Sequence, residues 1–560
     1  MDLNVPPTSR TCAESPEADT HIEMDSIRQD IRVALRLLWK HRGFSAAVAL
    51  TLALCLGANV ALFSVVNNVL LRPLPFLESE RIVLIGNSYP KAGAGNRVAV
   101  AVPDYFDRLR ETTVFEEQAL YDNVSVNVDQ SGTPTRVGAM NVTPSFFRVL
   151  RAGPLIGRTF TEDEGEIGKG QRVILSYAFW QSAFGGDRAI TGRDIRLDGQ
   201  PFTVVGVMPQ DFVYLRPDVM LWKALAFTPL QKSDQARHSN SFQQIGRLKP
   251  GATVARAQAE IDALNEATLE RFPQFKDLVL NTGFHTIVVR LHDELVRDVK
   301  ASLYLMWGGA LFVLLIGCVN VTNLVLVRSK ARLQELATRV ALGAGRGRLA
   351  RQLATEFVLL TLTAAAAGLS AGWAALRLLG PLNLQELPRG SEIHLDGVAV
   401  VVTLAVGAAI GGVLGLIPTA FVRRSDITAT LREEARSGTS SRGGRTLRRV
   451  LVVVQVGFAF ILLTGAGLLF SSFQRVLAVE PGFQSDPVLT ASVVLPRARY
   501  RGNADLLDFL NESLQRLRAL PEVQAAGTTS IIPLSGINRI GVIFPEGYQM
   551  RPGESVVAPT

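Results

Sequence analysis

"ASLYLMWGGALFVLLIGCVNVTNLVLV", residues 301–327, is an apolar stretch that contains no Asp, Glu, Lys or Arg. A helix of roughly 20 residues crosses the roughly 30 Å hydrocarbon core of a bilayer. Four more uncharged stretches of this kind lie at 44–71, 357–376, 397–422 and 450–473. A buried core helix is the alternative for each stretch, but helices of globular proteins usually carry a polar face. The sequence therefore predicts a polytopic α-helical membrane protein with five spans.

Basic residues indicate the orientation of these spans. Lys and Arg are frequent just before residue 44 and in segments 328–356 and 423–449, whereas the connection 380–396 has one arginine against three acids. Because Lys and Arg accumulate on the cytoplasmic side, we predict a cytoplasmic N-terminus, cytoplasmic segments 328–356 and 423–449, and external segments 72–300 and 474–560. The net charge of +8 fits this anchoring and attraction to membrane lipid, so nucleic acid is not an expected partner.

The N-terminal segment precedes the first span and divides in two. Residues 1–26 are acidic and poor in apolar side chains, which predicts a disordered cytoplasmic tail. Residues 27–43 are amphipathic, which predicts a helix on the membrane surface, with an early start of the first span as the alternative. Its apolar and basic positions are Ile27, Ile31, Leu35 and Leu38 against Arg28, Arg32 and Arg36.

The external segment 72–300 has the signals of an α+β domain. "DIRLDGQPFTVVGVMP" (194–209) predicts a β-hairpin around Asp198–Gly199. "QQIGRLKPGATVARAQAEIDALNEATLERF" (243–272) predicts a strand, a Pro-Gly turn and a helix capped by Thr253. The three cysteines are at 12, 55 and 318, so the domain depends on its core and not on disulfide bonds.

Catalytic and cofactor motifs are not found. The pattern G-x-x-x-x-G-K-[ST] does not occur, so we expect no cofactor bound by this chain and ATP hydrolysis only through another polypeptide. The six histidines lack metal-ligand spacing. "GLSAG" (368–372) matches a hydrolase motif but lies inside a span, where the required strand-turn-helix context is impossible. We therefore expect no enzyme.

Small and amide residues in the spans indicate helix packing. Small residues spaced four apart let helices approach closely, which predicts packing faces at Gly368, Gly372, Gly407, Gly411 and Gly415. The asparagines at 59, 67, 68, 320 and 323 are interpreted as interhelical hydrogen-bonding residues rather than as substrate ligands.

An internal repeat begins near the C-terminal end. Segment 446–483 has the plan of segment 34–76: basic residues, one apolar span, then Val-Leu, proline and Phe. We therefore expect residues 474–560 to start a second external domain, in a repeat that is truncated.

The segment "ELATRVALGAGRGRLARQLATE" (335–356) resembles the cytoplasmic segment of the MacB/FtsX-like ABC transporter permeases. Gly345 departs from the family pattern, which often has a helix-capping serine there; glycine is tolerated at small cost. "RGFSAAVALTLALCLGANVALFSVVNNVLLRPLPF" (42–76) and "ITGRDIRLDGQPFTVVGVMP" (190–209) look like the duplicated permeases often called acidobacterial duplicated orphan permeases. The pattern positions filled in the first segment are Glu335, Arg339, Ala341, Leu342, Gly343, Ala344, Leu349, Gln352 and Glu356.

The resemblance implies an inner-membrane permease with a periplasmic core domain that works with a separate cytosolic ABC ATPase, for efflux or mechanotransmission. A second permease half or a periplasmic partner is also implied. The residues themselves predict two helices around a turn at 343–347, with a short second helix that presents a surface to a partner. The alternative role for this segment is lipid binding alone. The alternative function for the whole chain is that of a membrane signalling scaffold, which gates a periplasmic partner without transporting a solute.

Overall fold

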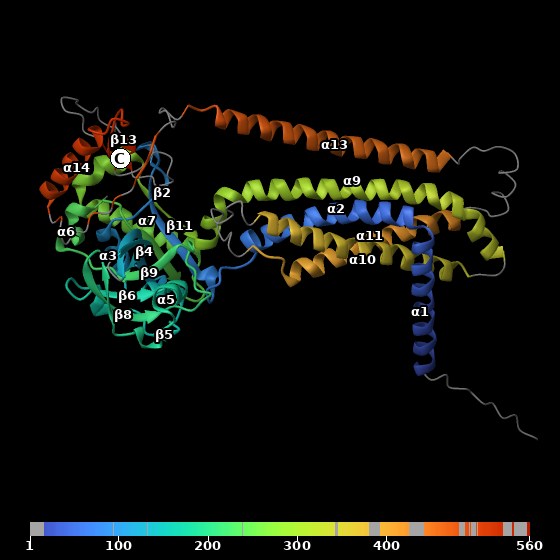
Figure 1. Cartoon of the computed structure of the whole chain (residues 1–560), viewed down its shortest axis with the longest axis horizontal. Helices are drawn as coiled ribbons and strands as arrows, with labels where there is room; N and C mark the ends of the chain where they lie inside the picture. Colours follow the sequence, from blue (N-terminus) through green and yellow to red (C-terminus); the bar gives the residue numbers. More distant parts are fainter. Residues whose placement is uncertain are drawn as a thin grey trace, which may run out of the picture. The chain divides into compact units, whose positions relative to one another are not determined.

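The computed structural model describes residues 16–92, 94–130, 133–237, 239–341, 345–379, 393–424, 442–480, 488–491, 493, 495, 500, 502–529, 540–542 and 557–559. The chain divides into two units. The membrane unit comprises Met1–Arg72 and Asp298–Asp486, and the external unit comprises Pro73–Arg297 and Pro487–Thr560. Figure 1 follows the elements of both units along the chain.

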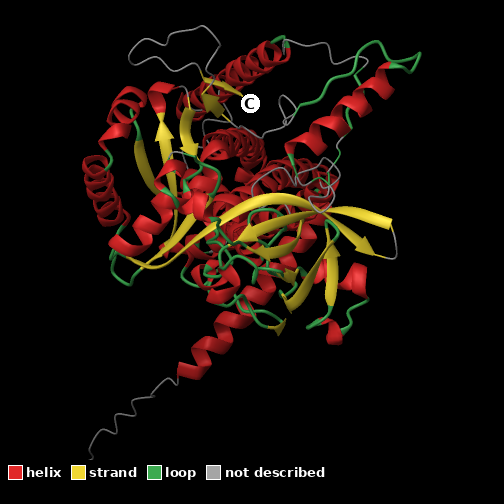
Figure 2. Cartoon of the chain, turned by 90° about the vertical axis from the view of Figure 1, so that its left-hand side faces the viewer, coloured by secondary structure: helices red, strands yellow, loops and turns green. Residues whose placement is uncertain are grey.

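The external unit is built on an eleven-stranded mixed sheet, whose strands are yellow in Figure 2. Its strand order is β11-β1-β10-β3-β4-β9-β6-β8-β5, with β2 beside β1 and β7 beside β3 and β8. The strands are β1 (Ile82–Tyr89), β2 (Ala94–Val98), β3 (Phe115–Gln130), β4 (Thr133–Val142), β5 (Ile156–Gly157), β6 (Arg172–Leu175), β7 (Asp194–Leu197), β8 (Gln200–Val207), β9 (Val219–Ala224), β10 (Gln243–Leu248) and β11 (His285–Arg290).

Short helices accompany this sheet, and a further pair of strands follows near the end of the chain. The helices are α3 (Val102–Glu111), α4 (Phe146–Leu150), α5 (Tyr177–Phe184), α6 (Pro229–Lys232), α7 (Val254–Arg271), α8 (Lys276–Thr282) and α14 (Asn503–Arg518). Strands β12 (Ile540–Val542) and β13 (Val557–Pro559) pair with each other. The unit therefore has the predicted α+β character.

Two local predictions for the external unit are confirmed. β7 and β8 form an antiparallel hairpin in which Leu197 pairs with Gln200 across the Asp-Gly turn. Asp198 and Gly199 both have positive φ, as a two-residue turn of this kind requires. Helix α7 begins after Thr253, whose side chain accepts a hydrogen bond from the backbone N–H of Arg256.

The largest core of the external unit is aromatic. Phe146 and Tyr214 lie edge to face with ring centroids 4.9 Å apart, and Phe147 and Trp222 belong to the same buried cluster. Leu291, the first residue of a helix that continues into the membrane unit, is also completely buried in this cluster. The packing of the external unit therefore includes the start of a membrane-spanning helix.

The membrane unit is helical. Among the residues that the structure describes, five helices are long and apolar enough to cross a membrane, and they lie at the five predicted spans. The helices of the unit are α1 (Pro16–Lys40), α2 (Arg42–Val66, extended by a π-helical turn at Asn67–Leu71), α9 (Leu291–Ala341), α10 (Arg346–Leu379), α11 (Gly397–Arg424) and α13 (Arg442–Leu477).

Helix α1 starts earlier than expected. It begins at Pro16, so the predicted disordered tail of residues 1–26 is wrong for its last eleven residues. Pro16 stands at a position where the missing N–H costs nothing, and Glu17 and Asp19 follow in the first turn, where negative charge favours a helix. These start signals outweigh the low hydrophobicity on which the prediction of disorder depended. His41 alone separates α1 from α2, and Figure 1 shows α1 turned away from α2.

One core joins four membrane helices. Buried side chains of α2, α9, α10 and α11, among them Leu52, Val321, Leu360 and Leu414, form a single cluster. Helix α13 contacts α9 through Phe458 and Phe312, whose ring centroids are 5.1 Å apart, but none of its apolar window is buried. The four clustered helices therefore form the packed body of the unit.

Asparagine side chains connect α2 to other parts of the unit, and the predicted interhelical hydrogen bond is confirmed for Asn59, whereas Asn67 and Asn68 bond to residues just before α11. Asn59 of α2 donates to the carbonyl oxygen of Ala310 on α9 over 2.7 Å. At the other end of α2, Asn67 and Asn68 donate to the Asp396 carboxylate (2.7 Å) and to the His394 carbonyl oxygen (3.0 Å). Polar side chains in the membrane are thus used to connect helices.

Glycines lie where α10 meets its neighbours. Gly57 of α2 faces Gly368 and Gly372 of α10, and a Cβ on Gly368 would lie 3.0 Å from the Ala53 carbonyl oxygen. On α11, Gly407, Gly411 and Gly415 face α10, where added Cβ atoms on the last two would lie 2.6 Å from the Val358 Cα and 2.7 Å from the Ala354 Cα. All five predicted packing glycines therefore lie at close helix crossings, and at Gly411 and Gly415 a side chain would collide with the α10 backbone.

We predict that Gly411→Ala lowers the melting temperature of the full chain in detergent, because its Cβ would collide with the α10 backbone. Gly412→Ala is the matched control, since a Cβ there meets nothing within 4 Å and alanine is the better helix former by about 0.5–1 kcal/mol. Thermal unfolding of both variants tests this. Equal melting temperatures for the two variants would contradict the packing role.

Candidate functional site

The structure describes the predicted coupling segment in part. Leu342, Gly343 and Ala344 lie outside the described residues. Glu335, Arg339 and Ala341 belong to the last turns of α9, and Leu349, Gln352 and Glu356 belong to the first turns of α10. The motif thus occupies the ends of two helices that are consecutive in the chain.

The predicted short helix across the base of the spans is wrong. Helix α9 runs unbroken for 51 residues, through its apolar stretch and on to Ala341. Helix α10 starts at Arg346 and continues into its own apolar stretch as far as Leu379. No proline or glycine separates Val327 from Ala341, and from Leu349 to Phe357 most residues are good helix formers. Both halves of the motif are therefore rigid extensions of membrane helices.

The start of α10 is packed into the membrane unit. The carbonyl oxygen of Gly345 accepts the backbone N–H of Leu349 over 3.3 Å, so the glycine occupies the capping position that its place in the motif predicts. Leu349, Leu353 and Phe357 follow at intervals of four residues and are all buried. Glu356 is also buried. The first turns of α10 are therefore fixed by buried side chains, of which Phe357 belongs to the four-helix core.

Helix α1 packs against this part of α10 through a contact that sequence reasoning missed. Asp30 of α1 is buried and its carboxylate accepts a hydrogen bond from Arg351 Nε over 2.9 Å. Ala34, one turn further along α1, is 1% exposed, which brings the two helices close together. Asp30 is the one acid of segment 27–43, where it lies between Arg28 and Arg32, and that isolated charge is the signal that the sequence offers.

The neighbouring side of α1 is apolar and exposed. Leu35 and Trp39, spaced by four residues, are 52% and 84% exposed. Tryptophan is enriched at membrane-water interfaces, where its ring is half buried among lipid headgroups. Helix α1 thus has one face against α10 and an adjacent apolar face that the protein does not cover.

A direct connection leads from α9 to the sheet of the external unit. Strand β11 ends at Arg290 and α9 begins at Leu291, with no loop residue between them. Leu291 is buried in the aromatic core of the external unit, while Leu314, Val321 and Val325 of the same helix are buried in the core of the membrane unit. One continuous helix is therefore anchored in both cores.

Metal chemistry receives no support from the described residues. Within the ranges that the structure covers, no group of three or more His, Cys, Asp or Glu side chains is arranged to hold a metal ion. The site consists of two helix ends that are consecutive in the chain, a third helix packed against one of them, and a helix that begins directly after strand β11.

Comparison with known families divides the chain in the same way. Residues 45–264 match the MacB-like periplasmic core domain, and residues 307–427 match the FtsX-like permease C-terminal family. The first match covers most of the segment Pro73–Arg297 of the external unit, and the second covers the membrane helices on both sides of the coupling segment. The chain is a membrane protein with an α+β extracytoplasmic domain.

Curated relatives carry the name "Macrolide export ATP-binding/permease protein MacB". The protein of Chromobacterium violaceum is 25% identical over 329 residues, which are 58% of this chain and 46% of that protein. The protein of Sodalis glossinidius is 26% identical over 361 residues, which are 60% and 51% of the two chains. The chain thus spans about half the length of the curated relatives it matches.

Two solved structures are similar to the external unit. The periplasmic region of MacB from Actinobacillus actinomycetemcomitans is 14% identical, covers 40% of this chain and 94% of its own, and gives a TM-score of 0.28. A domain of a putative permease protein from Porphyromonas gingivalis is 12% identical, covers 39% and 93%, and gives a TM-score of 0.31.

We predict that Asp30→Ala or Arg351→Ala releases α1 from α10, because a buried charged group without its partner costs on the order of 1–3 kcal/mol. The measurement is the rate of tryptic cleavage at the exposed Arg28 and Arg32, followed by mass spectrometry of the peptides that end at these residues. The rate should rise in both variants and rise no further when they are combined. Arg348→Ala, an exposed position on the same helix, is the control. An unchanged rate for Asp30→Ala would show that the ion pair does not hold α1.

Proposed function

We propose, from the premise that this chain belongs to the MacB/FtsX-like ABC transporter permeases, that it is the permease subunit that couples ATP hydrolysis by a separate ATPase to movements of its periplasmic domain. The chain itself binds no nucleotide in this proposal and catalyses no reaction. Its work is the transmission of force, for efflux or for control of a periplasmic process.

The observation that carries the proposal is the course of α9. Its 51 residues correspond to a helix of about 76 Å at 1.5 Å per residue, which exceeds the thickness of a bilayer. The helix starts at the end of a sheet strand and includes part of the coupling segment. Because an unbroken helix resists compression and bending, displacement of one end is transmitted to the other.

The input to this path is the pair of helix ends on either side of residues 342–345. Phe357 and Leu360 of α10 belong to the buried cluster that also contains Leu314, Val321 and Val325 of α9. An ATPase that binds the helix ends would therefore move α9 and α10 as one body. Helix α1, held by Asp30 and Arg351, adds a third element to the surface available to that partner.

The orientation and the other partners follow from charge and exposure. We place the N-terminus and the coupling segment in the cytoplasm and the external unit in the periplasm of the inner membrane, as the distribution of Lys and Arg favours. Leu35 and Trp39 of α1 are suited to lipid contact. The apolar surface of α13, none of it buried, is available to lipid or to a second permease half.

We predict that the full chain, purified from its native membrane in mild detergent, retains an ATPase with a nucleotide-binding motif. Deletion of residues 343–346, or Arg339→Ala, should abolish this association because both alter the predicted coupling segment. The association is measured by affinity purification and mass spectrometry. Gly412→Ala serves as a folded control. Absence of any ATPase from the wild-type sample would overturn the proposal.

A second prediction concerns transmission. Insertion of Gly-Ser-Gly after Arg297 interrupts α9, and the same insertion after Gly251 lengthens an exposed turn of the external unit as a control. With the ATPase bound, ATP should change the tryptic digestion of the external unit in the wild type and in the control, but not in the α9 variant. A persistent response to ATP in the α9 variant would show that force does not pass along this helix.

Transport and regulation are distinguished by phenotype. If the wild-type chain lowers the accumulation of a solute and the α9 insertion restores it, the output is efflux. If the insertion changes a periplasmic process while no solute accumulates, the output is gating of a periplasmic partner.

A further inference from the structure

The external unit contains a cavity of 340 Å³ that none of the steps above uses. It lies between α3, α7 and α8 and reaches the first residue of β11. Its lining includes the aromatic residues Phe272, Phe275 and Phe284 together with several charged residues. A concave site with an aromatic body and a few converging polar groups is the usual form of a small-molecule site.

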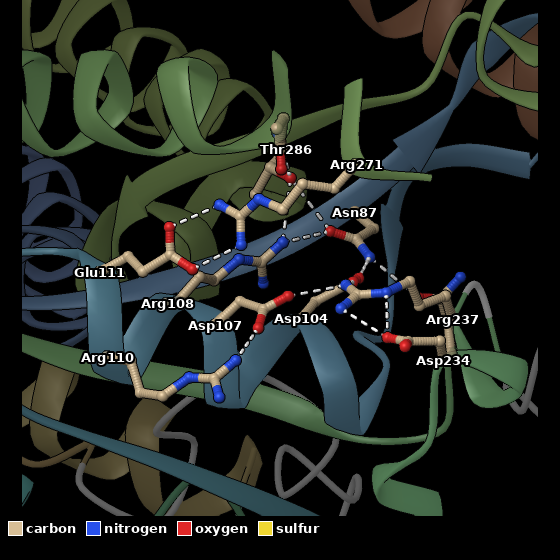
Figure 3. Close-up of polar contacts among 12 residues, drawn as sticks. Asn87, Asp104, Asp107, Arg108, Arg110, Glu111, Asp234, Arg237, Arg271 and Thr286 are labelled. Atoms are coloured by element: carbon tan, nitrogen blue, oxygen red, sulfur yellow. Dashed lines mark hydrogen bonds and ion pairs between the residues drawn. The ribbon is translucent and has the colours of Figure 1, made fainter. Parts of the chain in front are cut away.

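Helix α3 forms one wall of the cavity and contains a buried arginine, Arg108, that bonds it to neighbouring strands. Arg108 is 1% exposed and donates hydrogen bonds to the side-chain oxygens of Gln244 (2.7 Å), Asn87 (2.8 Å) and Thr286 (3.0 Å), as Figure 3 shows for the last two. Burial lowers the pKa of its guanidinium group. Because a buried charge is tolerated only with such partners, this wall is fixed in place before any ligand arrives.

The second arginine of the cavity, Arg237, also interacts with protein side chains. Arg237 forms ion pairs with Asp107 over 2.7 Å and with Asp234 over 2.9 Å, and its guanidinium group lies 4.2 Å from the centre of the Phe272 ring. Figure 3 shows Arg237 between these carboxylates. The donors of both arginines are therefore directed to protein groups, and an anionic ligand would have to displace them.

The remaining charge of the cavity is negative. Four carboxylates line it, those of Asp104, Asp107, Asp262 and Glu266, against two guanidinium groups. Asp262 and Glu266 lie one turn apart on α7 and are exposed. Among the described residues, no Lys or Arg forms an ion pair with either of them, although Asp262 accepts a hydrogen bond from Gln258 over 2.8 Å. The excess of carboxylates over guanidinium groups in the lining thus favours the binding of a cation.

We propose that this cavity binds a small organic ammonium ion, with its apolar body against Phe272, Phe275 and Phe284 and its charged nitrogen beside Asp262 and Glu266. Aromatic faces attract both apolar groups and cations, and the carboxylates supply the charge-assisted hydrogen bonds. The volume of the cavity limits the ligand to the lower end of the usual range for small-molecule sites. The site lies wholly in the external unit and is independent of the ATPase.

The test uses the full chain in lipid nanodiscs and three fluorinated probes that share one ring: 4-fluorophenethylamine, 4-fluorophenethyl alcohol and 3-(4-fluorophenyl)propanoate. Fluorine NMR line broadening should show saturable binding of the amine that unlabelled phenethylamine reverses. The alcohol should bind at least about tenfold more weakly, and the propanoate should not bind. Equal broadening by the alcohol, or no saturable binding of the amine, would overturn the proposal.

Variants locate the binding within the protein. Asp262→Asn combined with Glu266→Gln removes the charge at two exposed positions and should weaken amine binding by about tenfold or more. Glu270→Gln, on the same helix and outside the lining of the cavity, is the control and should bind as the wild type does. Val279→Phe, which fills part of the cavity, should also weaken binding. If the affinity for the amine is unchanged both in the Asp262→Asn, Glu266→Gln double variant and in Val279→Phe, the amine binds at another site and the proposal is wrong. Loss of ATPase association leaves these measurements unaffected, so the two proposals fail separately.

Discussion

The close contact of α10 with α2 and α11 is the constraint on which the membrane unit depends. In a bilayer, the hydrophobic effect does not drive apolar helices together, so association requires short backbone distances and many dispersion contacts. Gly57, Gly368 and Gly372 provide that distance on one side of α10, and Gly407, Gly411 and Gly415 provide it on the other. Because α10 also contains half of the segment for which we propose ATPase binding, the packing that stabilises the unit also fixes the position of that half.

Helix α9 extends this rigidity beyond the membrane unit. Leu291 is buried among the aromatic residues of the external unit, and Val321 and Val325 are buried with α2 and α10. Asn59 adds a hydrogen bond from α2 to the Ala310 carbonyl of α9, where hydrocarbon offers no competing water. Helix α9 thus contributes buried side chains to the cores of both units.

Buried charge has a different role in each unit. In the external unit, Arg108 and Arg237 are surrounded by hydrogen-bonding partners and stabilise one arrangement of α3, α7 and the strands around them. In the membrane unit, Asp30 and Arg351 join two helices at a partly exposed site, where the arginine side chain is 43% exposed. The first arrangement is rigid because several bonds would have to break together. The second depends on a single ion pair and is the more easily released.

The sequence by itself determined the features that depend on neighbouring residues or on the length of an apolar stretch. The five spans follow from uncharged runs long enough for a bilayer, the β7–β8 hairpin from Asp198–Gly199, and the start of α7 from Thr253. Only the tertiary structure decided that α1 packs on α10 through residues 321 positions apart, that α9 starts within the external core, and that one cavity collects residues from Asp104 to His285. The reason is physical: turns and caps are decided within a few residues, whereas a long-range ion pair or cavity exists only after the chain has folded around it.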